Sequence, residues 1–225
     1  MDTNTAKSAI FDSIRRNLAE SLPFDEIYNE HKVNRPQDEI IEIFDNSRSK
    51  SSLAEIFREN LRSIGANCEI VEDKSKAVSF IQTRINEKKL KKIAVSDAGL
   101  IGEIVGLLEF AGDFIRNASK EVLFETDLGI TSAQFGIAET GTLVIESDKE
   151  FNRLASLVPP IHICVLEAEK IHQTLGEVLQ ELEKDLSRSV TFITGQSRTS
   201  DIELTLALGV HGPAELHVIL IEKKI

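Results

Sequence analysis

Three short segments of the sequence are rich in glycine and in polar side chains that could bind a ligand or do chemistry. They span residues 136–142, 195–201 and 209–213. In an open α/β sheet, the loops that leave the carboxyl ends of the strands line the ligand crevice. The second segment follows an apolar run at 190–194, so we expect it at such a strand end.

The second segment has the side chains of an anion site. Gly195 allows a close backbone approach, Ser197 and Thr199 offer hydroxyls, and the guanidinium of Arg198 suits a carboxylate or phosphate. If a helix starts after this loop, its free N–H groups would add to the site. Asp201 would be unfavourable beside an anion and suits the helix dipole instead. The alternative is an ordinary capped helix with a surface arginine.

The other two segments each contain one residue that could act in catalysis. Glu139, followed by Thr140 and Gly141, precedes an apolar strand, and its carboxylate could be a nucleophile or base or could bond to a neighbouring loop. His211 lies among glycines and a proline, and an imidazole titrates near neutral pH. It could equally be a structural histidine bonded to a backbone carbonyl. We predict Glu139 and His211 as catalytic candidates and Thr140 and Gly141 as binding candidates.

A further glycine-rich turn follows a strand ending near Val95. Gly99, Gly102 and Gly106 come after Ser96 and Asp97. No G-x-G-x-x-G is present, so close packing of a helix on the sheet is the favoured interpretation over a binding turn. The histidines lack metal-ligand spacing such as H-E-x-x-H, and we predict no metal site.

The charge balance argues against nucleic acid as a partner. The chain has 26 Lys and Arg against 37 Asp and Glu, a net charge of −11, which repels a polyphosphate backbone. The sole basic run is Lys88, Lys89, Lys91 and Lys92. It is interpreted as a solvated helix end, with a polyanion patch as the alternative, and is given no function.

The two cysteines limit the redox chemistry of this chain. Cys68 and Cys164 lie 96 positions apart in apolar runs, where buried inert thiols are common. Two thiols are too few for an iron–sulfur cluster or a structural zinc site, so we expect no cofactor bound by this chain. The N-terminal residues carry charges throughout and lack a long apolar stretch, which predicts a cytoplasmic protein without a membrane span.

The elements that must position these residues alternate between strands and helices from residue 52 onward. Residues 5–20 form an amphipathic pattern, and 1–45 is expected to be an N-terminal helical arm before an α/β domain at 46–225. The expected strands are 68–71, 92–95, near 121–124, 142–145, 161–166, 190–194 and 216–222. The expected helices are 53–64, opened by a capping box at Ser52 and Glu55, then 75–89, 100–110, a short one opened by Ser147 and Glu150, 169–186, and one opened by a capping box at Ser200 and Glu203. Together they predict a mostly parallel sheet covered by helices on both faces.

The segment 202–210 could form either a strand or a helix. Its apolar residues alternate with period two, which favours a strand. We predict a helix, because the capping box precedes it, Gly209 can stop it, and a parallel return to Leu216 needs a long crossover.

The ordered blocks GIAETGTLVIES, NRLASLVPPIHICVL and TFITGQSRTSDIELTLALGVHGPAELHVILIE resemble the lactate-utilization (LUD) domain, in particular its stand-alone lactate-utilization protein C type. The resemblance covers roughly residues 50 to 222. It implies a three-layer α/β/α fold like that of ribose-phosphate isomerase and the CoA transferases. It also implies a part in the oxidation of L-lactate to pyruvate beside iron–sulfur partner proteins.

Three functions of different classes therefore stay open. The chain could be a non-redox subunit of a lactate-oxidising complex that binds a small carboxylate or other anion, such as phosphate. It could be a free-standing enzyme of isomerase or CoA-transferase type that uses Glu139, or a non-catalytic anion-binding or regulatory module. Homo-oligomers are compatible with each.

Overall fold

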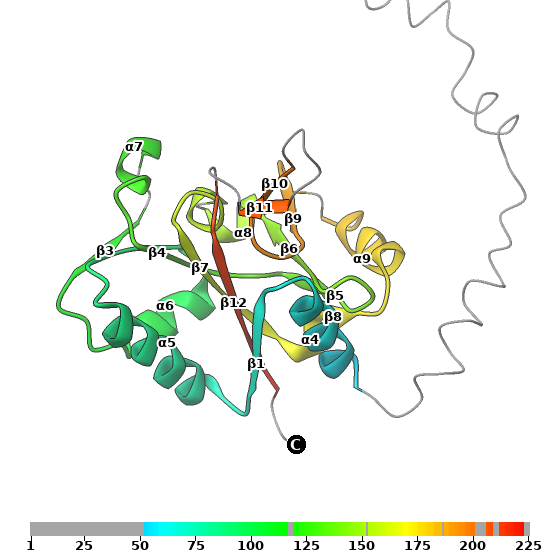
Figure 1. Cartoon of the computed structure of the whole chain (residues 1–225). Helices are drawn as coiled ribbons and strands as arrows, with labels where there is room; N and C mark the ends of the chain where they lie inside the picture. Colours follow the sequence, from blue (N-terminus) through cyan, green and yellow to red (C-terminus); the bar gives the residue numbers. More distant parts are fainter. Residues whose placement is uncertain are drawn as a thin grey trace, which may run out of the picture. The chain divides into compact units, whose positions relative to one another are not determined.

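The computed structural model describes residues 52–116, 119–151, 153–185, 187–200, 206–208 and 212–222 (Figure 1). The predicted arm at 1–45, with its helix at 5–20, lies outside these residues and stays a prediction.

A parallel sheet of six strands forms the centre of the described domain. Its order is β1-β12-β7-β4-β2-β3, and all neighbouring pairs are parallel. The strands are β1 (Asn67–Val71), β12 (Glu215–Ile221), β7 (Ile161–Glu167), β4 (Leu128–Ser132), β2 (Lys92–Val95) and β3 (Asp113–Ile115). The inner strands β12, β7 and β4 are runs of buried residues, as expected where both faces of a parallel sheet are covered. The predicted α/β class is confirmed.

Helices cover both faces of this sheet. On one face lie α5 (Lys74–Lys88) and α6 (Gly99–Val105), which pack Ile81, Ile101 and Ile104 on the sheet. On the other face lies α4 (Leu53–Ser63), which packs Phe57 and Leu61. The helix α4 begins where its sequence predicts, because the Ser52 hydroxyl accepts the Glu55 N–H at 3.3 Å.

A second, four-stranded sheet accompanies α4 on that face. Its order is β8-β5-β6-β9. The strands are β8 (Ile171–His172), β5 (Phe135–Ile137), β6 (Thr142–Glu146) and β9 (Val190–Ile193). Helix α9 (Leu175–Leu182) packs Val178 and Leu182 against it. The strands β6 and β9 match predicted ones, but the sequence analysis predicted a single, mostly parallel sheet and did not foresee the second.

The predicted strand near 121–124 is wrong, because this segment forms the one-turn helix α7 (Lys120–Leu123). Leu123 is fully buried against Ala94 and Ala155, whereas Val122 and Phe124 are exposed. The three apolar residues Val122, Leu123 and Phe124 are too short a run to distinguish a strand from a short helix by their pattern.

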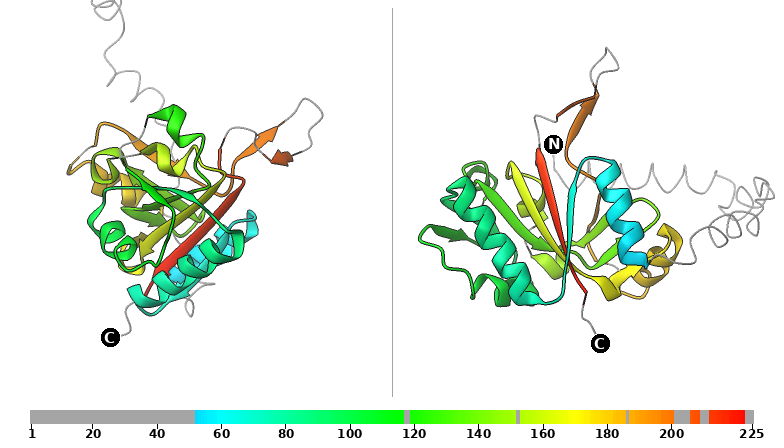
Figure 2. Two further views of the ribbon diagram at one scale, coloured as in Figure 1. Left: turned by 90° about the vertical axis from the view of Figure 1, so that its left-hand side faces the viewer. Right: turned by 60° about the horizontal axis from the view of Figure 1, so that its bottom comes forward.

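The predicted helix after Ser200 is also wrong where the structure describes it. The strands β10 (Arg198–Ser200) and β11 (Leu206–Leu208) pair antiparallel. Figure 2 shows this hairpin standing out from the two sheets. The crossover argument failed because β9 belongs to the second sheet, so no parallel crossover joins β9 to β12.

Two predicted helices are shorter than expected. Helix α6 ends at Val105, with Gly106 at its C-cap. The segment predicted as one helix at 169–186 divides into a 3₁₀ turn, η2 (Ala168–Lys170), then β8 and α9. The capping box that starts α9 is made by Thr174 and Glu177, which lie inside the predicted helix.

The predicted short helix from 147 is α8 (Ser147–Glu150), followed by the 3₁₀ turn η1 (Arg153–Ser156).

The central strand β4 was missed because a glycine interrupts its apolar pattern. A Cβ atom on Gly129 would lie 1.8 Å from the carbonyl oxygen of Ala155 in η1. The glycine therefore permits the close approach of η1 to the sheet.

A search for membrane spans, confined to the described residues, finds no helix with the length and hydropathy to cross a bilayer.

Candidate functional site

The strands β2 and β4 are neighbours whose onward connections leave in opposite directions. After β2 the chain passes through α6 to β3 at the sheet edge, and after β4 it returns toward β7. Such a reversal opens a crevice at the carboxyl ends of the two strands, where α/β proteins bind their ligands. Residues 96–97 follow β2, and Ser132 ends β4. We call this place the switch point.

A buried carboxylate occupies the switch point. Glu150, at the end of α8, has no exposed surface. Its Oε2 accepts the Ser132 N–H at 2.9 Å, and its Oε1 accepts the Ser132 hydroxyl and, at 2.8 Å, the Gln134 amide. A buried carboxylate is costly unless donors surround it. Three donors therefore hold Glu150 at the carboxyl end of β4.

Polar groups that follow β2 and β3 adjoin the backbone of Glu150 and one another. The Asp97 N–H donates to the Glu150 carbonyl at 3.2 Å. The Arg116 guanidinium donates to the Asp97 carboxylate at 3.0 Å and to the Ser96 carbonyl at 3.3 Å. The Ser96 hydroxyl is fully buried and has no hydrogen-bond partner among the described residues. A buried hydroxyl without a partner is unusual in a folded protein, and it marks the switch point as a place that a ligand or water could complete.

Gly99 and Gly102 do not pack closely, contrary to the favoured interpretation. Among the described residues, no neighbouring atom lies within 4 Å of a Cβ atom built on either glycine. The start of α6 is therefore open beside Ser96 and Asp97.

A pocket of about 470 Å³ lies at α8, the short helix that ends in Glu150. It is lined by Ser147, Asp148, Phe151, Arg188 and Ser189. Phe151 has a φ of +57°, a left-handed conformation that is an outlier for a bulky residue, and its ring is exposed. The Arg188 Nε lies 3.2 Å from Asp148 Oδ1, and the arginine side chain is 91% exposed. Residues with a strained backbone of this kind are frequent at ligand sites, which makes this pocket a candidate site. We call it the Arg188 pocket.

The first predicted segment forms the turn between β5 and β6. The Glu139 carboxylate accepts the Leu175 N–H at 2.8 Å, at the first residue of α9. The hydroxyls of Thr140 and Thr142 lie 2.6 Å apart. Gly141 has a φ of +65°, and a Cβ atom there would lie 2.5 Å from the Leu61 nitrogen of α4. In this structure Glu139 contacts a neighbouring element, the second alternative of the sequence analysis, and its catalytic role stays a prediction.

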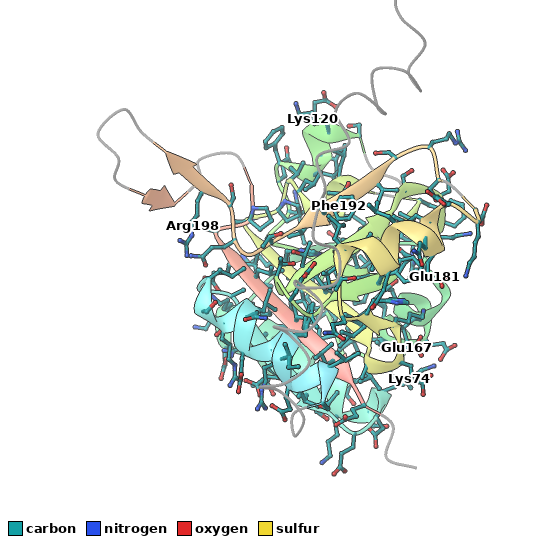
Figure 3. The ribbon with its side chains drawn as sticks, turned by 90° about the vertical axis from the view of Figure 1, so that its right-hand side faces the viewer. Lys74, Lys120, Glu167, Glu181, Phe192 and Arg198 are labelled. Carbon is teal, nitrogen blue, oxygen red and sulfur yellow. The ribbon has the colours of Figure 1, made fainter. Side chains whose placement is uncertain are left out.

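The second predicted segment runs from β9 into β10 and packs on the end of α4. The Arg198 guanidinium donates to the Ile64 carbonyl at 2.5 Å, and Figure 3 shows this side chain at the base of β10. Gly195, with a φ of +85°, lies against the Ile64 side chain, and the Ser197 N–H donates to the Pro213 carbonyl at 2.8 Å. Because β10 replaces the expected helix, no helix N-terminus accompanies Arg198.

The structure thus brings Gly141, Gly195 and Arg198 together around the C-terminal end of α4, while Glu139 lies at the start of α9. Of Thr199 it describes the backbone within β10. Asp201 and His211 lie outside the described residues. Anion binding at these positions stays a prediction.

The sequence analysis missed the β4 side of the switch point, and at Ser96 and Asp97 it favoured close packing over a binding turn. Glu150 was noted only as part of a helix start, and Ser132 and Gln134 were not singled out. These two residues can be recognised only through β4, because Ser132 ends this strand and Gln134 lies two residues beyond it. Recognising β4 as a strand would have placed them at the carboxyl edge of the sheet.

The buried thiols and imidazoles are poorly suited to acid–base chemistry near neutral pH. Burial raises the pKa of the Cys68 thiol to about 12 and also raises the pKa of Cys164. Burial lowers the pKa of His162 to about 3, and its Nε2 lies 2.8 Å from the Thr131 hydroxyl. In the part of the chain that the structure describes, no group of three or more His, Cys, Asp or Glu side chains could hold a metal ion.

The model of the LUD domain matches residues 54–221. The chain belongs to the LUD domain family. This confirms the resemblance inferred from the three sequence blocks, and the match includes every residue of the switch point.

Curated relatives of this LUD domain match it over shorter stretches. An uncharacterized protein of Neisseria meningitidis serogroup B is 39% identical over 104 residues, which is 45% of this chain and 45% of that protein. A lactate utilization protein C of Deinococcus radiodurans is 38% identical over 102 residues, 44% of this chain and 48% of the relative. The lactate utilization protein C of Bacillus subtilis is 31% identical over 106 residues, 44% of each chain. The matched stretch spans about half the length of each relative.

A solved structure supports the fold of this LUD domain. The crystal structure of a DUF162 family protein from Deinococcus radiodurans has a TM-score of 0.59 and 24% identity. The structural match covers 76% of this chain and 99% of the solved chain.

Proposed function

We propose that this chain is a component of a lactate-utilization system. The observation that carries the proposal is its membership of the LUD domain family, together with several relatives that bear the name lactate utilization protein C.

Within this system, the chain acts as a non-redox subunit beside iron–sulfur proteins that oxidise L-lactate to pyruvate. The oxidation removes two electrons and two protons from lactate, so an electron acceptor is required. An iron–sulfur cluster usually needs four thiolate ligands, and this chain has two cysteines. Both are buried and their pKa values are raised. These features support the assignment of the clusters to the partner proteins.

In this proposal, the small carboxylate ligand of the complex binds to this chain in the Arg188 pocket. Asp148 contacts the guanidinium through Nε and also accepts the Arg188 N–H at 3.1 Å, which would orient the side chain and leave its η nitrogens for a second carboxylate. The exposed ring of Phe151 offers an apolar surface for a methyl group. An arginine fork suits a carboxylate in both geometry and charge.

Reconstitution with iron–sulfur proteins of a lactate-utilization system tests the proposal. We expect the three proteins to copurify and to reduce a dye in the presence of L-lactate. The variant Arg188→Gln should raise the lactate concentration for half-maximal rate by about tenfold, as expected for one lost charged hydrogen bond. The matched control is Arg84→Gln, since Arg84 lies on α5 and pairs with Glu87 at 3.1 Å.

Two outcomes would contradict parts of the proposal. Full lactate-dependent activity without this chain would remove its role as a subunit. An unchanged response of Arg188→Gln would remove the carboxylate site while leaving the subunit role intact. Turnover of a phosphosugar or an acyl-CoA by the purified chain alone, abolished in Glu139→Gln, would favour the free-standing enzyme instead.

A further inference from the structure

The basic run of the sequence divides into two pairs of lysines with different surroundings. The Lys88 ammonium lies 2.7 Å from a Glu215 carboxylate oxygen, and the Lys92 ammonium lies 2.8 Å from one of Glu125. Lys89 and Lys91 have no ion-pair partner in the described parts of the chain. Two unpaired neighbouring cations are notable in a chain with a net charge of −11.

These two unpaired lysines line a pocket at the amino ends of β2 and β3. The pocket has a volume of about 470 Å³, within the usual range for small-molecule sites. Its apolar lining includes Ile85, Leu90 and Phe110. Glu109 is the acidic residue among the lining residues. The pocket thus combines an apolar surface with two cations and one carboxylate, and we call it the lysine pocket.

Hydrogen bonds hold the walls of the lysine pocket in place. Lys89 has left-handed backbone angles at the C-cap of α5, and its N–H donates to the Ile85 and Asn86 carbonyls. The Lys91 N–H donates to the Asp127 carboxylate at 2.8 Å.

The opposite wall is fixed through α5. The Gln82 amide accepts the Glu109 N–H at 2.8 Å and donates to the Glu109 carbonyl at 2.9 Å. A Cβ atom on Gly112 would lie 2.2 Å from the Lys91 carbonyl oxygen, so a glycine lets the two walls meet. A preformed pocket loses less entropy when a ligand binds.

We propose that the lysine pocket binds an amphiphilic monoanion, meaning a carboxylate or sulfonate joined to an aromatic or alkyl body. The head group pairs with the ammonium groups of Lys89 and Lys91, and the body lies on Leu90 and Phe110. The carboxylate of Glu109 disfavours a second negative charge. The site is at the amino ends of the strands, whereas the switch point is at their carboxyl ends, and it does not depend on the proposed function.

Fluorescence titration of the full chain with 8-anilinonaphthalene-1-sulfonate tests the proposal. We expect saturable binding that octanoate displaces and inorganic phosphate does not. The double variant Lys89→Gln and Lys91→Gln should weaken binding by about tenfold or more, because two charged contacts are lost. Glu109→Gln should tighten binding, because it removes a repulsive charge.

The matched control is the double variant Lys88→Gln and Lys92→Gln, which removes the same charge from the paired lysines. Its dissociation constant should stay within about twofold of the wild-type value, since direct contacts decide the affinity rather than net charge. Three results would overturn the proposal: no saturable binding, equal weakening by both double variants, or displacement by phosphate as effective as by octanoate.

Discussion

The side chain of Glu150 is a buried acceptor on which several neighbouring donors depend. We predict that Glu150→Ala lowers the free energy of unfolding by about 3 kcal/mol, because it leaves the buried Ser132 N–H and hydroxyl without their acceptor. Glu150→Gln should cost less, since its amide oxygen still accepts. Urea unfolding followed by circular dichroism measures both.

The matched control is Glu169→Ala. The Glu169 side chain is exposed, and such a substitution changes stability by less than about 0.5 kcal/mol. Equal effects of the two alanine variants would contradict the structural importance of Glu150.

The buried imidazole of His162 makes stability depend on pH. Its pKa in the folded chain is lowered to about 3, whereas an unperturbed histidine titrates near 6.5. Between these values the unfolded chain binds the proton and the folded chain does not, so stability falls as the pH falls from about 6.5 to about 3. The lowered pKa of His217 acts in the same direction.

Unfolding free energies at pH 4 and pH 7 check this prediction. The difference in unfolding free energy between pH 7 and pH 4 should be smaller in His162→Gln than in the wild type, even if the variant is less stable at both pH values. His172→Gln, at a half-buried position on β8, should retain the wild-type difference. If His162→Gln shows the same difference between the two pH values as the wild type, this imidazole does not set the pH dependence of stability.

At the scale of elements, two glycines with opposite surroundings test how β4 and α6 are packed. Gly129→Ala should destabilise the domain by about 3 kcal/mol, because its Cβ atom would collide with the Ala155 carbonyl and displace η1. Gly102→Ala should stabilise the domain by about 0.5–1 kcal/mol, because alanine favours a helix and open space surrounds the site. Thermal unfolding measures both, and shifts of the same sign would contradict the described packing.

How far the sequence predicts the fold can be seen in these same elements. The helix α4 was predicted from its own capping residues, and β7 from its own apolar run. The strand β4 was not, because Gly129 is required by η1, which lies further along the chain. The hairpin of β10 and β11 was predicted as a helix, because its topology depends on which sheet β9 joins. Local signals were sufficient only where the element's partners did not decide its structure.

The residues of the candidate site were likewise predictable only where their contacts with other elements did not decide their role. Arg198 and Glu139 were chosen for their chemistry, yet both make contacts with the end of a helix. Glu150 was not chosen, because it becomes a site residue only when α8 is folded back on β4. Residue type alone did not distinguish a structural contact from a ligand contact.

At the scale of the whole molecule, the burial of both cysteines predicts that their thiols are chemically inert in the folded chain. Because the Cys68 pKa is raised to about 12 and that of Cys164 is also raised, almost no thiolate exists at pH 8. We predict that Ellman's reagent labels neither thiol of the folded chain within an hour and labels both in urea. Rapid labelling of either thiol in the folded chain would contradict the buried positions.

The place of β12 in the sheet has a consequence for the order in which the chain can fold during synthesis. β12 lies between β1 and β7, and Asn67 pairs with His217. During synthesis on a ribosome, β1 therefore cannot pair with β12, its only neighbour in the described sheet, until almost all of the domain has been translated. Contacts so distant in sequence make folding slow. Until β12 pairs with them, β1 and β7 each present an edge of unpaired backbone N–H and C=O groups. A nascent chain of this protein is thus expected to depend on chaperones more than its modest size suggests.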